Sequence, residues 1–215
     1  MSIDMRRCAA DARRAIFIAS KAVKALGDRL DASFADAVRL IASSRGHLVT
    51  SGVGKSGIAA NKIAATFAST GVRSMFIHAA DACHGDLGMV GKDDVGLLVS
   101  NSGESEELLR IVPFFKRYGI PIIALSGDAR SSLAKCSDCW LDISVDAEVG
   151  GGLVAMASTI AAVAMGDALA VAVMTARQPT VEELAAIHPG GLLGAKLRDA
   201  VTEQNHMAKI LVGAE

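Results

Sequence analysis

The sequence has few aromatic residues, few prolines, few cysteines and no excess of charge of either sign. Aromatic side chains make up 4% of its 215 residues, with one Trp and one Tyr, so a surface that stacks single-stranded bases is not expected. Its 22 Lys and Arg residues against 23 Asp and Glu residues give a net charge of −1. Because no positive excess is available to neutralise a phosphate backbone, we expect no nucleic-acid partner.

The four cysteines are too few for a disulfide framework in a chain of this length. Cys136 and Cys139 form one C-x-x-C pair, which without a second pair is a weak signal for zinc or redox chemistry. The N-terminal stretch is rich in arginine, but its apolar run, 15–19, is too short for a secretion signal. The sequence therefore predicts a cytoplasmic protein without a metal site.

One segment, 153–176, is long enough and apolar enough to suggest a membrane-spanning helix. It is built mainly on alanine, however, and Asp167 lies near its middle. An acidic residue at that depth costs about 2.5–3.5 kcal/mol on insertion scales. We therefore expect a helix buried within the protein or at a subunit interface, and no membrane partner.

Five short apolar runs end in turn signals and predict strands, at 47–51, 74–78, 95–100, 121–126 and 140–145. The first four are continuously apolar, as in strands that are buried on both faces of a parallel sheet. Helical patterns lie between them, and this alternation favours right-handed crossovers with helices on both faces of the sheet. The expected fold is α/β, a three-layer α-β-α sandwich whose five-stranded parallel sheet has the flavodoxin-like order 2-1-3-4-5.

Further helices are expected on both sides of this core. Two helical stretches, 4–26 and 31–44, precede the first strand, and a short helix opens at Thr180, where Thr180 and Glu183 form a capping box. No repeat, low-complexity tract or linker interrupts the chain. We expect a single domain over 1–215, with N-terminal helices in 1–45 and the sheet core and C-terminal helices in 46–200.

The loop after the first predicted strand, 51–57, is rich in glycine. It does not fit the P-loop pattern, because Val49 stands where that pattern needs glycine. The dinucleotide pattern G-x-G-x-x-G does match, but the nearest acidic residue, Asp81, lies beyond the end of the second predicted strand. NAD is therefore the less favoured ligand. Small residues at this position still let backbone N–H groups at a helix N-terminus approach a phosphate.

The loop after the third predicted strand supplies three hydroxyl groups, from Ser100, Ser102 and Ser105, at the start of a helix. In the expected strand order, the loops after strands one and three flank the topological switch point, where ligands bind. Two such loops meeting there favour a phosphate monoester as ligand. The alternative is that both are ordinary tight turns with helix N-caps.

Four segments together, GVGKSG, HAADACHGDLGMV, SNSGESEE and IHPGGLLG, resemble the sugar isomerase (SIS) domain of the arabinose-5-phosphate isomerases over about residues 30–200. Many members of that family carry a pair of CBS domains after the SIS domain, and we expect a form without that pair. The resemblance implies a homotetramer with its active site at a subunit interface.

The resemblance also implies which residues form the site. The sugar phosphate would be bound by Ser56, Ser100, Ser102 and Ser105, with further substrate contacts from Gly54, Asn101, Ser158 and Thr159. The active-site residues would be Lys55, His84, Glu107, Glu148 and His188. Because the site lies between subunits, His188 is expected to act on the substrate of a neighbouring chain.

The activity implied is the interconversion of D-arabinose 5-phosphate and D-ribulose 5-phosphate, a step that would supply the synthesis of the lipopolysaccharide sugar Kdo. Such an isomerase opens the sugar ring, removes a proton next to a carbonyl group and returns it to the adjacent carbon through an enediolate. Glu107 or Glu148 suits the proton transfer if burial raises its pKa. Lys55 would stabilise the oxyanion or the phosphate charge.

Imidazole groups suit the remaining steps, ring opening and proton transfer between oxygens, because they titrate near neutral pH. His84 and His188 would perform them, and no cofactor is needed. A metal site built from these two histidines is not supported by their spacing. Each residue taken alone also has a structural explanation. An acidic residue such as Glu107 in the first turn of a helix is stabilised by the helix dipole, Glu148 suits a surface loop, and His188 suits a helix C-cap.

Two other functions remain open. One alternative is an isomerase of another sugar phosphate, such as a hexulose 6-phosphate. The other is a non-catalytic sugar-phosphate sensor of the SIS type. The segment after Glu148 lacks the proline and is about one residue shorter than in the family pattern. This segment borders the expected sugar site, so the difference bears on the identity of the substrate more than on the type of reaction.

Overall fold

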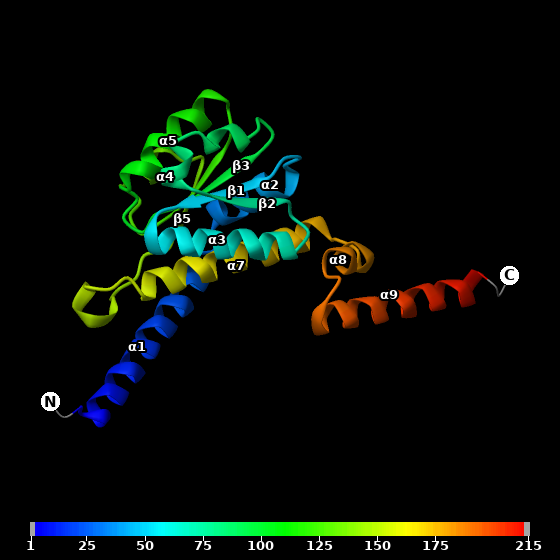
Figure 1. The fold of residues 1–215 in the computed structure, drawn as a ribbon, viewed down its shortest axis with the longest axis horizontal. Helices are drawn as coiled ribbons and strands as arrows, with labels where there is room; N and C mark the ends of the chain where they lie inside the picture. The colour runs from blue at the N-terminus through cyan, green and yellow to red at the C-terminus, as the bar shows by residue number, and fades with distance from the viewer. Residues whose placement is uncertain (1–2, 213–215) are drawn as a thin grey trace.

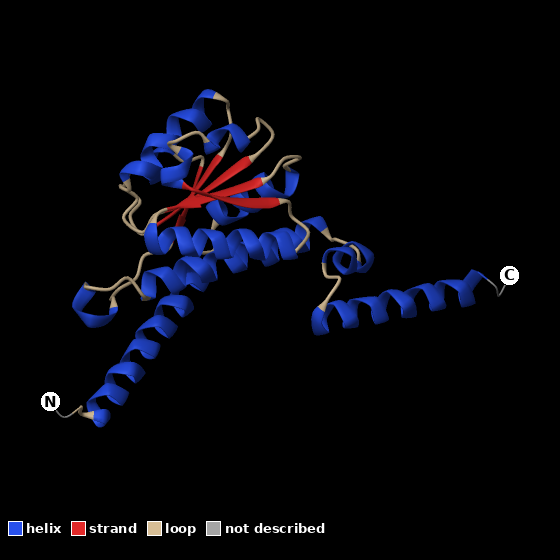
Figure 2. Ribbon diagram, in the orientation of Figure 1, coloured by secondary structure: helices blue, strands red, loops and turns tan. Residues whose placement is uncertain are grey.

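A five-stranded parallel sheet forms the centre of residues 3–212, the part of the chain that the computed structural model describes (Figures 1 and 2). Neighbouring strands are all parallel, in the order β2-β1-β3-β4-β5. The strands are β1 Leu48–Gly52, β2 Ser74–His78, β3 Val95–Val99, β4 Ile122–Ser126 and β5 Cys139–Asp142. The predicted fold class and strand order are confirmed, and no strand end differs from its predicted position by more than three residues.

Two layers of helices bury the two faces of the sheet, and each has its own hydrophobic core. On one face lie α2 Ala32–Ser43, α3 Gly54–Ser69 and α7 Ala157–Arg177. The other face is covered by α4 Ala79–Ala82, α5 Glu106–Arg117 and α6 Ser132–Cys136, seen above the sheet in Figure 1. Because successive strand residues point to opposite faces, this arrangement explains why every residue of β1, β3 and β4 is buried.

The alanine-rich helix α7 packs against other helices of the domain. Among the described helices it alone is long and apolar enough to cross a bilayer, yet it packs against α3, α2 and α1 Met5–Leu26. Asp167, the charged residue in its middle, forms an ion pair with Lys62 of α3. The helix begins at Ala157 and not at 153: 149–152 form the short 3-10 helix η3, and 153–156 are not helical.

The two ends of the chain extend away from the sheet in different directions (Figure 1). The predicted capping box is present at α8 Val181–Ile187: the Glu183 N–H donates to Thr180 Oγ1 at 3.1 Å, and the Thr180 N–H donates to Glu183 Oε2 at 2.8 Å. A further helix, α9 Gly191–Val212, was not predicted from the sequence. The remaining 3-10 helices are η1 Gly27–Arg29 and η2 Asp86–Met89.

Candidate active site

The loops that follow β1 and β3 meet at the carboxyl edge of the sheet. These strands are neighbours, and their last residues, Gly52 and Val99, are paired in the sheet register. A Cβ atom at position 52 would lie 2.9 Å from the carbonyl oxygen of Val99 and 2.9 Å from the backbone of Ser56. Only glycine lets the β1–α3 loop pass this close to the end of β3, and the two loops therefore share one space at the switch point.

Both helices that begin at this point lack a capping side chain. The side chain of Val53, before α3, has no polar group, and the side chain of Ser105, before α5, makes no hydrogen bond to the first turn of its helix. By contrast, α1, α2, α6 and α8 are each capped by the residue before them, respectively Asp4, Asp31, Ser131 and Thr180. The first N–H groups of α3 and α5 are therefore available to an anion.

The hydroxyl groups of residues 100–105, the serine loop, converge on a single point. Ser100 is buried, and its Oγ lies 2.9 Å from Ser105 Oγ and 3.5 Å from Ser102 Oγ. The same Oγ accepts a hydrogen bond of 3.0 Å from the Gly103 N–H. This network explains why Ser105 does not cap α5. It also holds three hydroxyl groups together for an incoming phosphate.

The first turn of α5 brings two more of the expected site residues together. The thiol of Cys83 donates to the backbone oxygen of Glu107 at 3.5 Å, which places His84 beside this turn. His84 is exposed and Glu107 is half-buried. Among the residues that the structure describes, the Glu107 carboxylate has no hydrogen-bond partner, so it is free to contact a ligand.

Glu148 accepts three backbone hydrogen bonds at the start of α7. Its Oε2 accepts hydrogen bonds from the N–H groups of Met156 and Ala157, at 2.9 and 2.8 Å, and its Oε1 accepts one from the Ser158 N–H at 2.9 Å. Burial by itself raises the pKa of Glu148, but the Ser158 side chain and these backbone N–H groups outweigh burial and lower the pKa. A raised pKa was the condition under which Glu148 would suit the proton transfer, and this condition is not met, because the carboxylate caps the N-terminus of α7.

This cap predicts a pH effect on stability. Because the folded-state pKa of Glu148 is lowered, its contribution to the free energy of unfolding is present above the ordinary glutamate pKa and is lost as the pH falls through the folded-state value. We expect Glu148→Gln to be less stable than the wild type at neutral pH, with a smaller difference in acid. Urea unfolding at both pH values measures this, and an equal difference at both would contradict it.

Comparison with known proteins agrees with the fold. Residues 40–172 match the family model described as SIS domain. The chain belongs to the SIS domain family. It is 43% identical over 199 residues to "Arabinose 5-phosphate isomerase KdsD" of Pseudomonas aeruginosa, covering 92% of this chain and 61% of that protein. It is 47% identical over 163 residues to the protein of the same name in Escherichia coli K12, covering 75% of this chain and 50% of that one.

Among solved structures, one similar protein is c3406 of E. coli CFT073, in complex with arabinose 5-phosphate. It superposes with a TM-score of 0.82 at 38% identity, over 87% of this chain and 100% of that chain. This SIS domain therefore spans the whole of that solved chain, but only about half to three-fifths of the curated relatives it matches. The family membership expected from the four sequence segments is confirmed.

The N-terminus of α7 lies at the same end of the SIS domain as the loops that follow β1 and β3. The Lys62–Asp167 ion pair joins α3 and α7 near their middles, and Figure 1 shows the two helices starting at the same end. Gly54, Lys55 and Ser56 at the start of α3 are thus on the same side of the molecule as Glu148. Ser158, which is buried, and Thr159 follow in the first turn of α7.

His188 is not brought to this end of the molecule. It follows α8, and its Nδ1 lies 2.8 Å from the Leu184 carbonyl oxygen. The preceding Ile187 lines a cavity together with His47 and Ser74, which lie at the amino ends of β1 and β2. Since the 21 residues of α7 span about 30 Å, His188 lies at the opposite end of its own chain from Glu148.

Helix α1 borders a cavity beside Glu148, which no sequence signal indicated. Asp11 and Arg14 of α1 line a cavity of about 710 Å³ together with Glu148 and Gly150. The charged residues of α1 resemble those of any solvated helix face, so only tertiary structure identifies them.

Within residues 3–212, no cluster of three or more His, Cys, Asp or Glu side chains could hold a metal ion. Cys136 is exposed, and burial raises the pKa of the Cys139 thiol.

Proposed function

We propose that this SIS domain is an aldose–ketose isomerase that interconverts D-arabinose 5-phosphate and D-ribulose 5-phosphate. The observation that carries the proposal is the switch point, where two uncapped helix N-termini and three converging hydroxyl groups form a site suited to a phosphate monoester. A free carboxylate, a lysine and a histidine lie around it. The names of the KdsD relatives and the arabinose 5-phosphate complex of the similar structure support the choice of sugar.

The phosphate group is bound by the hydroxyl groups of Ser56, Ser100, Ser102 and Ser105 and by the first N–H groups of α3 and α5. Gly54, Asn101, Ser158 and Thr159 contact the rest of the sugar. These contacts hold the open-chain aldose with its carbonyl group among the residues that move protons.

Glu107 removes the proton from C2 of the aldose and returns it to C1, because its carboxylate is free whereas that of Glu148 is occupied. Between these steps the enediolate transfers a proton from O2 to O1, so C1 becomes an alcohol and C2 a ketone with no net oxidation. Lys55 stabilises the negative charge of the enediolate. His84 and His188 move the oxygen-bound protons and open the ring, while Glu148 shapes the site by capping α7.

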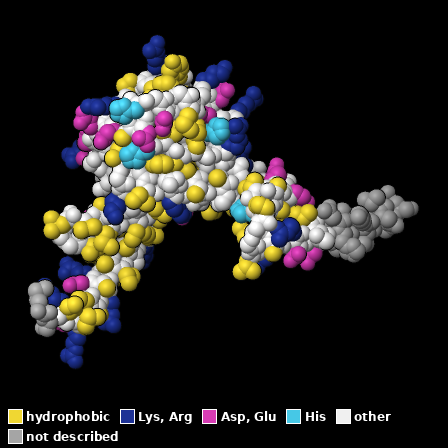
Figure 3. Space-filling model, in the orientation of Figure 1, with side chains coloured by type: hydrophobic (Ala, Val, Ile, Leu, Met, Phe, Trp, Pro, Cys, Tyr) yellow, Lys and Arg dark blue, Asp and Glu magenta, His cyan; other side chains and the backbone are white. Residues whose placement is uncertain are grey.

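The position of His188 supports a shared active site. In this proposal the His188 of one chain completes the site of another within a homotetramer. Both extended parts of the chain carry exposed apolar side chains that another subunit would cover: Ile16 and Phe17 on α1 are 71% and 57% exposed, and Leu192 and Leu193 on α9 are 85% and 54% exposed (Figure 3). The enzyme would act in the cytoplasm, in the supply of Kdo.

The test is the formation of ribulose 5-phosphate from arabinose 5-phosphate by the purified protein with no added cofactor, beside a sample treated with EDTA. We expect turnover in both samples. Turnover lost only in the EDTA sample would contradict the cofactor-free mechanism. Absence of turnover in both, with arabinose 5-phosphate still bound, would instead indicate a different sugar phosphate or a sensor.

A further inference from the structure

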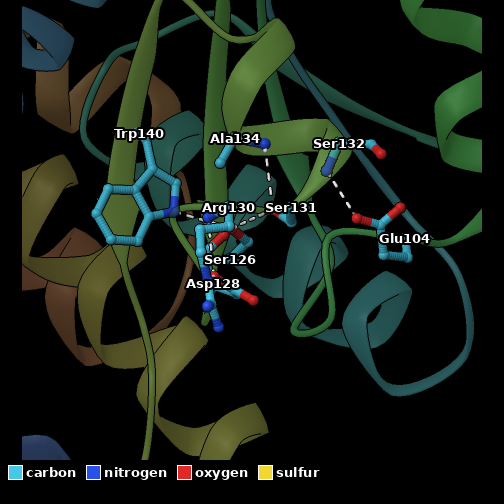
Figure 4. Close-up of polar contacts among 8 residues, drawn as sticks. All are labelled: Glu104, Ser126, Asp128, Arg130, Ser131, Ser132, Ala134 and Trp140. Carbon is cyan, nitrogen blue, oxygen red and sulfur yellow. Dashed lines mark hydrogen bonds and ion pairs between the residues drawn. The ribbon is translucent and has the colours of Figure 1, made fainter.

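The serine loop rests against one neighbouring segment, 127–133, which connects β4 to α6. Two backbone hydrogen bonds join them: the Gly127 N–H donates to the Asn101 oxygen at 2.9 Å, and the Leu133 N–H donates to the Gly103 oxygen at 3.1 Å. The third contact is made by a side chain. Glu104 Oε1 accepts a hydrogen bond of 2.7 Å from the Ser132 N–H, as Figure 4 shows.

Segment 127–133 is itself held firmly by the core. Leu133 is fully buried, and buried Ser131 caps α6 by accepting from the Ala134 N–H at 3.3 Å. At the start of the segment, the Trp140 indole N–H donates to Ser126 Oγ at 2.8 Å (Figure 4). The segment therefore provides a fixed support for the more exposed serine loop.

The loop lies as close to this support as its backbone allows. Gly103 has a φ of +67°, and a Cβ atom there would lie 2.2 Å from Ser131 Oγ. The next residue, Glu104, links segment 127–133 to a serine hydroxyl: its side chain accepts a hydrogen bond from the Ser132 N–H, while its own N–H donates to Ser102 Oγ at 3.2 Å. A shift of Glu104 would therefore move a hydroxyl group of the phosphate site.

The charge of Glu104 works against a role in binding the ligand itself. A carboxylate within a phosphate-binding loop repels the anion, so its presence there needs another explanation. The hydrogen bond from the Ser132 backbone lowers the pKa of Glu104, because it stabilises the ionised carboxylate.

We propose that Glu104 is a positioning residue, whose hydrogen bond to the Ser132 N–H holds the serine loop in the conformation that binds phosphate. This inference rests on the proposed function, in that the serine loop is taken as the phosphate site. Two explanations then predict opposite signs. If Glu104 acts as a nearby charge, removing it tightens phosphate binding; if it positions the loop, removing it weakens binding.

The experiment compares Glu104→Ala, Ser132→Pro and the double variant by KM for arabinose 5-phosphate and by calorimetric titration with inorganic phosphate. Proline removes the N–H donor at the first position of α6, where helices accept it, and Ser131 already has the extended backbone that proline requires. We expect each single variant to raise KM and the phosphate Kd about tenfold, with kcat changed less than about threefold. The double variant should be no worse than either single one, because both remove the same bond.

Two matched controls separate geometry from charge. Glu104→Gln keeps an acceptor oxygen and should stay within about threefold of the wild type. Glu106→Ala removes the same charge two residues along, where, among the described residues, the carboxylate pairs only with Arg110, and it should leave KM unchanged or lower it. Thermal unfolding of every variant shows whether it is folded.

The inference is overturned if folded Glu104→Ala binds phosphate as tightly as the wild type or more tightly, or if the two single effects add in the double variant. A wild type that turns over no arabinose 5-phosphate but binds phosphate would overturn the proposed reaction alone, and the phosphate titrations would still decide the role of Glu104. A wild type that binds no phosphate would overturn both.

Discussion

Mixing two inactive variants, His188→Ala and Lys55→Ala, is expected to restore turnover to about one-quarter of the wild-type value. Each variant alone should be nearly inactive, because every site in it lacks one group. When chains assemble at random in equal amounts, one site in about four takes its carboxyl-edge residues from a His188→Ala chain and its histidine from a Lys55→Ala chain, and is complete. The structure supports this result because His188 lies at the opposite end of its own chain from Glu148.

The matched control is a mixture of Lys55→Ala and Glu107→Gln. Both residues lie at the carboxyl edge of the same chain, so every site in any mixture lacks at least one of them and no turnover should return. The chains are refolded together from denaturant, and activity is assayed against arabinose 5-phosphate. If the His188→Ala mixture stays as inactive as this control, His188 does not complete a neighbour's site.

Glu107→Gln is expected to lower kcat by about 10²–10⁴-fold while the protein still binds arabinose 5-phosphate. Glutamine has nearly the same shape but cannot accept the proton from C2, and the loss of a positioned general base has this magnitude. Binding should be retained or slightly tighter, because a negative charge near the phosphate is removed. Since the Glu107 carboxylate makes no hydrogen bond among the described residues, the thermal unfolding midpoint should hardly change.

Two further variants make this test specific. Glu106→Gln, on the exposed side of the same helical turn, should keep full kcat because its carboxylate pairs only with Arg110. Glu148→Gln should lower the unfolding midpoint as well as activity, because it weakens the cap of α7. If Glu107→Gln turns over within about threefold of the wild type, Glu107 is not the base and the role passes to Glu148.

Much of the fold could be predicted because its signals are local. The runs of β3 and β4, which contain almost no polar residue, indicate strands buried on both faces, and Thr180 and Glu183 show where α8 begins. The ends of elements were less predictable. The apolar run from 153 suggested a helix, but 149–152 form a 3-10 helix and α7 starts at Ala157. The sequence His-Pro-Gly-Gly correctly predicted the end of α8, but the start of α9 at Gly191 was not predicted from it.

The candidate site also has features that could be predicted from the sequence and features that could not. Glycine and serine residues in the loops after β1 and β3 were recognisable as a phosphate site, because the requirement for small residues and hydroxyl groups is met within each loop. The contact of Glu104 with Ser132 was not recognisable, since its partners are 28 residues apart and the bond uses a backbone N–H that any residue would supply.

The sequence by itself determined the α/β architecture, the strand order and the two loops at the switch point, because hydrophobic periodicity and loop composition are properties of short segments. Only the tertiary structure decided that Glu148 caps α7 with a lowered pKa, that Glu107 is free, and that His188 lies far from both. The physical reason is that the state of a carboxylate or an imidazole depends on the donors and charges around it, and folding draws these from distant parts of the chain.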